Sequence, residues 1–201
     1  MATTLTATNT ERTAVSTPMT ADELLRLPSD RHRYELIEGE LRTMTPASPR
    51  HGRIANTLAF LLTQHARQHE LGVVYAAESG FQLHENPDTV RAADAAFIAG
   101  SRIPPEGEPE GYWALAPDLV AEVVSASDSA SAVHAKVADW LPFQGPVGGA
   151  GCRLVWVVYP DTQTVAEYRS LTEIRVLTAD QSLEGGDVLP GFVCQVGDLF
   201  A

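Results

Sequence analysis

The sequence is poor in cysteine and has no long apolar run. Its two cysteines, Cys152 and Cys194, lie far apart without metal-ligand spacing. They predict buried thiols in a reducing cytoplasm rather than a zinc site or a disulfide framework. No apolar segment approaches the ~20 residues needed to cross a membrane. Residues 1–18 have neither an apolar segment nor periodicity, so we expect a disordered tail and not a targeting signal. We therefore expect a cytoplasmic protein with no membrane partner.

Basic residues are also scarce. The 14 Lys and Arg residues are outnumbered by 26 Asp and Glu residues, which gives a net charge of −12. This charge opposes nonspecific binding to nucleic acid or to an anionic membrane, although it permits a local basic or metal-filled cleft. The 201 residues, 44% of them hydrophobic and 20% charged, indicate one globular domain with a sizeable core. We assign that single domain to residues 19–201.

The apolar and polar pattern predicts an α/β fold. A capping-box pattern over 20–23 begins a short helix, and helical or alternating periodicity defines the later elements. In chain order we expect a helix before Pro28, a β-hairpin over 33–45, a helix over 51–69, strands over 73–83 and 89–98, a strand around Glu122, a helix to about Leu141, a strand over 153–159 and a closing hairpin over 164–169 and 173–178. This order predicts a mixed β-sheet flanked by helices, with an N-terminal β-hairpin and a C-terminal β extension.

Glu122 is the residue that an account of function has to explain. It lies in the segment PDLVAEVVSASD, residues 117–128. The segment has the pattern of a strand buried on both faces, with apolar side chains at Leu119, Val120, Ala121, Val123 and Val124. A carboxylate in such a strand costs on the order of several kcal/mol unless it is compensated. Glu122 therefore requires a charged partner, a metal ion or a raised pKa.

Asp94 is the acid of the preceding predicted strand, in an otherwise apolar row. If the two strands are neighbours, Asp94 and Glu122 can meet on one face, and two close carboxylates repel unless a cation lies between them. Oxygen ligands from Asp, Glu, a backbone carbonyl and water suit Mg²⁺ or Mn²⁺. The alternative is a pair of separately solvated acids at strand ends, and the spacing alone favours neither.

Lys136 adds a third charged group. The helix that follows the Glu122 strand has a predicted buried stripe of Val133, Val137 and Trp140. Lys136 falls about 60° from that stripe at 100° per residue, so its amine can reach back toward the sheet. A lone lysine at such a position more often extends to water. Together, however, two acids and a lysine supply the parts that hydrolysis of a phosphodiester needs.

At these residues the chain resembles the Uma2 family of restriction endonuclease homologues, within the PD-(D/E)XK nuclease superfamily. The resemblance covers about residues 19–201. The matching segments are YELIEGEL (34–41), TPASPRHGRIA (45–55), ESGFQL (78–83), VRAADAAFI (90–98), APDLVAEVVSASD (116–128), KVADWL (136–141), CRLVWVVYP (152–160) and LEGGDVLPGF (183–192). The resemblance implies a restriction-endonuclease-like core.

The resemblance also assigns roles to the acids and to the lysine. Asp94 and Glu122 correspond to the two signature acids and would hold the metal with help from the Val123 carbonyl. The usual lysine position is Val124 here, so the lysine of this family is matched to Lys136 on the following helix. Lys136 would orient the attacking water or stabilise the transition state.

Further polar residues are implied in supporting roles. Glu35 would complete the acid cluster, and His51 and Glu78 would assist. The chain departs from the family pattern at Ala93 and Ala126, where prolines are usual, and in a longer connector over 144–151. The connector bears most on the assignment of Lys136, because it could shift that helix.

The expected function is that of a Mg²⁺-dependent (or Mn²⁺-dependent) endonuclease acting on DNA. A homodimer is expected because cutting both strands needs two sites. The alternative is a catalytically inactive nuclease-like scaffold that binds a protein or nucleic-acid partner. The net charge of −12 favours this alternative, because DNA-cutting surfaces are usually basic.

Overall fold

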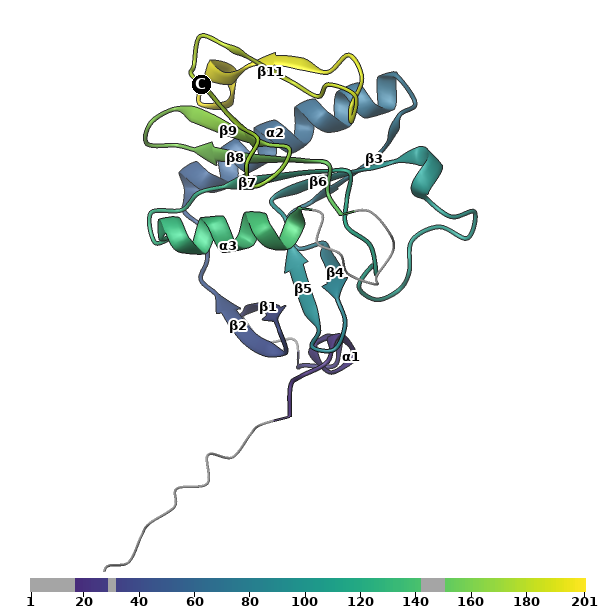
Figure 1. Ribbon diagram of the computed structural model, residues 1–201. Helices are drawn as coiled ribbons and strands as arrows, with labels where there is room; N and C mark the ends of the chain where they lie inside the picture. The colour runs from purple at the N-terminus through teal and green to yellow at the C-terminus, as the bar shows by residue number, and fades with distance from the viewer. Residues whose placement is uncertain (1–16, 29–31, 142–150) are drawn as a thin grey trace, which may run out of the picture.

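The central element of the computed structural model is a six-stranded mixed sheet (Figure 1). The structure describes residues 17–28, 32–141 and 151–201. The strands lie in the order β10 (Ile174–Leu177), β9 (Thr164–Tyr168), β8 (Leu154–Tyr159), β7 (Leu119–Val123), β6 (Ala95–Ala99) and β3 (Gly72–Ala76). β7 and β8 are parallel and the other neighbouring pairs are antiparallel. The predicted mixed sheet is therefore confirmed.

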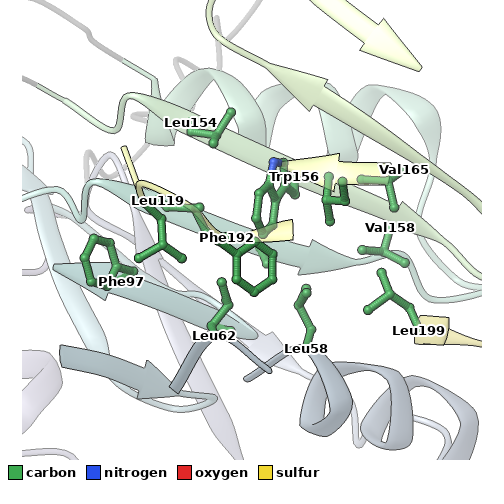
Figure 2. Packing of buried hydrophobic residues seen from close by; sticks show 14 of the residues in the cluster. Leu58, Leu62, Phe97, Leu119, Leu154, Trp156, Val158, Val165, Phe192 and Leu199 are labelled. Atoms are coloured by element: carbon green, nitrogen blue, oxygen red, sulfur yellow. The ribbon is translucent and has the colours of Figure 1, made fainter. Parts of the chain in front are cut away.

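Helix α2 (Pro49–Gln68) packs on one face of this sheet. Its N-terminus is capped by Ser48, whose side chain accepts a hydrogen bond from the backbone of His51. Figure 2 shows Leu58 and Leu62 pointing from α2 into the cluster that contains Trp156 and Phe192. Burying these large side chains is the main stabilising term for this layer.

Helix α3 (Ala130–Trp140) packs on the opposite face. Val137 and Trp140 are almost completely buried and belong to a cluster with Val120 and Val157 of the sheet. Alternation along β7 places Leu119, Ala121 and Val123 in the α2 cluster and Val120 in the α3 cluster. Because Glu122 is two residues from Val120, its side chain points to the α3 face.

A second, four-stranded sheet lies beside the core, and its strand order is β2 (Glu40–Met44), β1 (Arg33–Ile37), β5 (Thr89–Ala92) and β4 (Gly80–His84). The short helix α1 (Ala21–Leu25) packs on it through a small apolar cluster. The predicted N-terminal hairpin is β1 and β2, and the capping box of α1 is present.

The prediction that 73–83 and 89–98 each form one continuous strand is wrong. Each is divided between the two sheets, into β3 and β4 and into β5 and β6. The first division is a turn in which Glu78 has a positive φ of 78°. The second is a bend at Asp94, whose side chain bonds to a neighbouring strand instead of continuing the row. The chain thus crosses from one sheet to the other at both points.

The C-terminal segment covers the α2 face of the core. It forms a small sheet of β11 (Ser182–Glu184) and β12 (Val193–Gln195), followed by the 3₁₀ turn η2 (Val196–Leu199). A second 3₁₀ turn, η1 (Gly100–Arg102), follows β6. The predicted closing hairpin is β9 and β10. Most of the predicted tail over 1–18 and of the connector over 144–151 lies outside the described residues.

None of the helices in the described ranges combines the length and the apolar character that crossing a bilayer requires.

Candidate active site

Asp94 and Glu122 lie next to each other across two paired strands. β6 and β7 are antiparallel with Ala95 opposite Ala121, which brings Asp94, just before β6, beside Glu122 on β7. Asp94 Oδ2 accepts a 2.7 Å hydrogen bond from the backbone N–H of Val123. The predicted adjacency of the two acids is therefore confirmed, whereas their predicted role as metal ligands stays a prediction.

His51, in the first turn of α2, lies against Asp94. The distance between His51 Nε2 and Asp94 Oδ2 is 3.2 Å, and both side chains are largely buried. The hydrogen bond to Asp94 raises the pKa of His51. Burial alone would raise the pKa of Asp94, but the contacts with His51 and with Val123 N–H outweigh burial and lower it. The contact keeps Asp94 ionised, as a metal ligand or an electrostatic group requires.

Glu122 is 6% exposed and has two side-chain partners on α3. Its Oε2 atom is 2.8 Å from Lys136 Nζ, and its Oε1 atom accepts a 2.7 Å hydrogen bond from Trp140 Nε1. Burial, opposed by Lys136, raises the pKa of Glu122 to about 7. The cost anticipated for this glutamate is thus met by a charged partner, a hydrogen-bond donor and a shifted pKa together.

Lys136 extends toward the sheet and not to water. Besides its bond to Glu122, its Nζ atom is 3.7 Å from Glu35 Oε1. Burial alone would lower the pKa of Lys136, but Glu122 and Glu35 outweigh it and raise the pKa. Lys136 therefore remains a cation beside the acid pair, in the position that the resemblance implies.

Glu35 reaches the site from β1, in the second sheet. It is 3% exposed and accepts a 2.7 Å bond from Arg91 and a 3.2 Å bond from the backbone N–H of Ala92. Arg91 also donates to Asp139 of α3 through Nε at 2.9 Å. Arg91 and Lys136 thus connect the second sheet to α3 through buried ion pairs.

The sequence patterns assign no place in the site to three of these polar residues. Trp140 is predicted only as a buried apolar residue, and Asp139 has no signal of its own. Arg91 has one signal, a charge within an apolar strand, which is the same pattern as at Asp94. Glu78, by contrast, lies on the cavity rim, where its largely exposed carboxylate is 3.4 Å from Arg33 Nε.

The residues at this point suit a hard cation. The donor set is two carboxylates and a backbone carbonyl, and Mg²⁺ is commonly held by one or two carboxylates plus waters. Within the described ranges there is no group of three or more His, Cys, Asp and Glu arranged to hold a metal ion. A metal at Asp94 and Glu122 would therefore need the Val123 carbonyl, water or substrate oxygens as further ligands.

The mixed sheet between two helices, with adjacent acids just before β6 and on β7, has the architecture of a restriction-endonuclease-like core. The chain belongs to the Uma2 family, described as "Putative restriction endonuclease", whose model matches residues 21–197.

A solved structure has the same fold. It is the crystal structure of "a putative nuclease belonging to DUF820" from Anabaena variabilis, with a TM-score of 0.75 and 24% sequence identity. The match covers 91% of this chain and 98% of that one. A comparison with curated proteins finds no match.

Proposed function

We propose that this protein is a Mg²⁺-dependent endonuclease that hydrolyses phosphodiester bonds of DNA. The observation that carries the proposal is the adjacency of Asp94 and Glu122, with Lys136 in contact with Glu122, on the wall of a cavity. Family membership supports nuclease chemistry, and nucleic acid is the substrate class that follows from it.

Each residue has a role that its surroundings support. Asp94, Glu122 and the Val123 carbonyl would hold Mg²⁺, which when bound supplies a Lewis acid for the phosphate and lowers the pKa of water. His51 keeps Asp94 ionised. Lys136 places a positive charge where negative charge develops on the phosphate oxygens. Glu35, fixed by Arg91, gives Lys136 a second carboxylate partner, so that the amine remains charged and oriented.

The first test is calorimetric titration of Mn²⁺ and Mg²⁺ into the wild type and into Asp94→Ala. We expect binding in the wild type and at least tenfold weaker binding in the variant, because one of two carboxylate ligands is lost. Since the pKa of Glu122 is about 7, a proton competes with the cation below that pH. The metal affinity should therefore fall by up to about tenfold per pH unit as the pH drops below 7.

The same titration separates the second candidate function, a nuclease-like scaffold that does not cut. The charge of −12 favours it, and so does the pairing of every lysine and arginine that lines the cavity within the described residues. The scaffold predicts no metal binding at Asp94 and no metal-dependent cleavage by the wild type. Equal metal affinity in the wild type and Asp94→Ala would contradict the proposed site.

A further inference from the structure

The acid pair lies in the wall of a cavity of about 480 Å³ that is open to solvent on one side. α1 and the second sheet contribute to the same lining as the acid pair. Pockets of 300–1,000 Å³ typically enclose molecules of small-ligand size. A cavity of this volume has room for one nucleotide with its phosphate.

The lining suits an unstacked base. Besides charged groups, the lining contains large apolar side chains, among them Leu24, Ile37 and Met44, and the two tyrosines Tyr34 and Tyr112. Aromatic and apolar side chains are the surfaces on which splayed-out bases of single strands pack. A site that only followed the backbone of a duplex would not need such a lining.

The charges near the site disfavour the binding of a duplex through the phosphates of its two strands. Binding a duplex depends on cations that neutralise phosphates along both strands. At the cavity, Arg33 is paired with Glu78 at 3.4 Å and Arg42 with Glu40 at 2.6 Å. Arg91 and Lys136 are engaged with buried acids. The net charge of −12 adds repulsion at longer range.

From these observations we propose that the substrate is DNA with an unpaired nucleotide, as in a single strand or a single-stranded tail, which enters the cavity to place its phosphate at Asp94 and Glu122. This inference rests on the proposed function, because it specifies the substrate of the same site.

The test compares one oligonucleotide sequence as a single strand, as a blunt duplex and as a duplex with a single-stranded tail of about 12 nucleotides. With Mn²⁺, we expect cleavage of the single strand and of the tail at least tenfold faster than cleavage of the blunt duplex. Binding of the same molecules to Glu122→Gln, followed by fluorescence anisotropy, should show the same order. Equal or faster cleavage of the blunt duplex overturns the inference and leaves the nuclease function intact.

The binding measurement distinguishes failure of the proposed nuclease function from failure of the proposed ligand class. Absence of cleavage of every DNA, with tighter binding of the single strand, would refute the nuclease function and support the ligand class. Equal binding of duplex and single strand would overturn the ligand class whether or not the DNA is cut.

Tyr112→Leu tests the cavity itself. Because stacking of a base on an aromatic side chain contributes ~1–3 kcal/mol, we expect about tenfold weaker binding of the single strand. Phe60→Leu is the matched control, since Phe60 is 61% exposed on α2 and does not line the cavity. Equal affinity of Tyr112→Leu and wild type would count against the base-binding role of the cavity.

A separate observation concerns β10, the outermost strand of the six-stranded sheet. The backbone N–H of Arg169 donates to the carbonyl of Glu173, and Arg175 is opposite Glu167 in the same register. In an antiparallel pair, residues that hydrogen-bond to the neighbouring strand alternate with residues that do not. Because residues 173 and 175 are in the bonded positions, the backbone groups of Ile174 and Val176 point away from β9. Their side chains are 48% and 61% exposed. The edge is therefore open and apolar in the part of the chain that the structure describes.

This edge is complementary to itself. We propose that β10 pairs antiparallel with β10 of a second copy, with Ile174 opposite Ile174 on the two-fold axis. In that register the outward backbone groups of Ile174 meet those of Ile174 in the other copy. Glu173 of each copy then lies opposite Arg175 of the other, which gives two cross-strand ion pairs. Neither side chain has an ion-pair partner within the described residues. The strand is short, so we expect a weak dimer that depends on concentration.

Sedimentation equilibrium tests this pairing. The wild type should form a dimer at micromolar to millimolar concentration, and Arg175→Glu should weaken it at least tenfold by placing Glu opposite Glu. The double variant Glu173→Arg/Arg175→Glu should restore the dimer, because it exchanges the two charges and leaves the net charge unchanged. Arg26→Glu is the control, because it makes the same change in net charge as Arg175→Glu at a position away from β10. A monomeric wild type, or no recovery in the double variant, overturns the pairing.

Discussion

Glu122→Gln is expected to reduce the rate of metal-dependent DNA cleavage by on the order of 10³-fold while leaving the fold intact. The substitution removes one of the two proposed carboxylate ligands and the charge that faces Lys136. The measurement is the single-turnover cleavage rate at saturating Mn²⁺, with circular dichroism and the midpoint of thermal unfolding as checks of the fold.

The variant should still fold, because most of the surroundings of Glu122 remain satisfied. The amide oxygen can accept the hydrogen bond that Trp140 Nε1 donates to Glu122. Lys136 keeps Glu35 as a carboxylate at 3.7 Å. Glu184→Gln is the control, because Glu184 is exposed on β11 and lies outside the cavity. A cleavage rate of Glu122→Gln equal to that of the wild type would refute the assignment of Glu122.

The sequence predicts the core of this site because the side-chain pattern of a strand depends only on residues that are close together in the chain. Apolar residues on both sides of Glu122 predict a strand buried on both faces, and all five residues of β7 are buried. The two-residue period then places Glu122 on the α3 face with Val120. The offset of Lys136 from the helical stripe allows the contact with Glu122 but does not select it, because a lone lysine at such a position more often extends to water. The family resemblance is what assigns Lys136 to the site.

The rest of the site depends on contacts between distant segments, which local patterns do not contain. Arg91 meets Glu35 and Asp139 only because β5 leaves the main sheet and pairs with β1. The bend at Asp94 that directs β5 there has no glycine or proline to mark it. The family resemblance implies that Glu35 belongs to the acid cluster, whereas no periodicity in its own hairpin indicates a contact with α3.

The division of the chain between two sheets also explains how the cavity arises. β4 and β5 carry the chain out of the six-stranded sheet, β1 pairs with β5, and β2 pairs with β1. This places Glu35 and the cavity lining of the second sheet opposite Lys136. The contacts of the second sheet with α3 must therefore hold both the acid cluster and the cavity wall in place.

Arg91→Met is expected to lower the free energy of unfolding by about 3–5 kcal/mol, since it leaves buried carboxylates without their cation. Arg91 is 6% exposed and lies between Glu35 and Asp139. Methionine retains most of the side-chain volume, so the effect should reflect charge and hydrogen bonding more than a cavity. The measurement is unfolding in urea at neutral pH. The control is Arg26→Met, because the pair Arg26–Asp22 is exposed and should contribute less than about 1 kcal/mol.

A second substitution distinguishes the loss of charge compensation from a general loss of packing. Glu35→Gln in the Arg91→Met background removes one of the unpaired carboxylates, so the double variant should be more stable than Arg91→Met alone. If packing of the arginine side chain were the whole effect, adding Glu35→Gln would lower stability further or leave it unchanged. Recovery of stability in the double variant would show that Arg91 stabilises the joint between the second sheet and α3 by compensating the buried charge of Glu35.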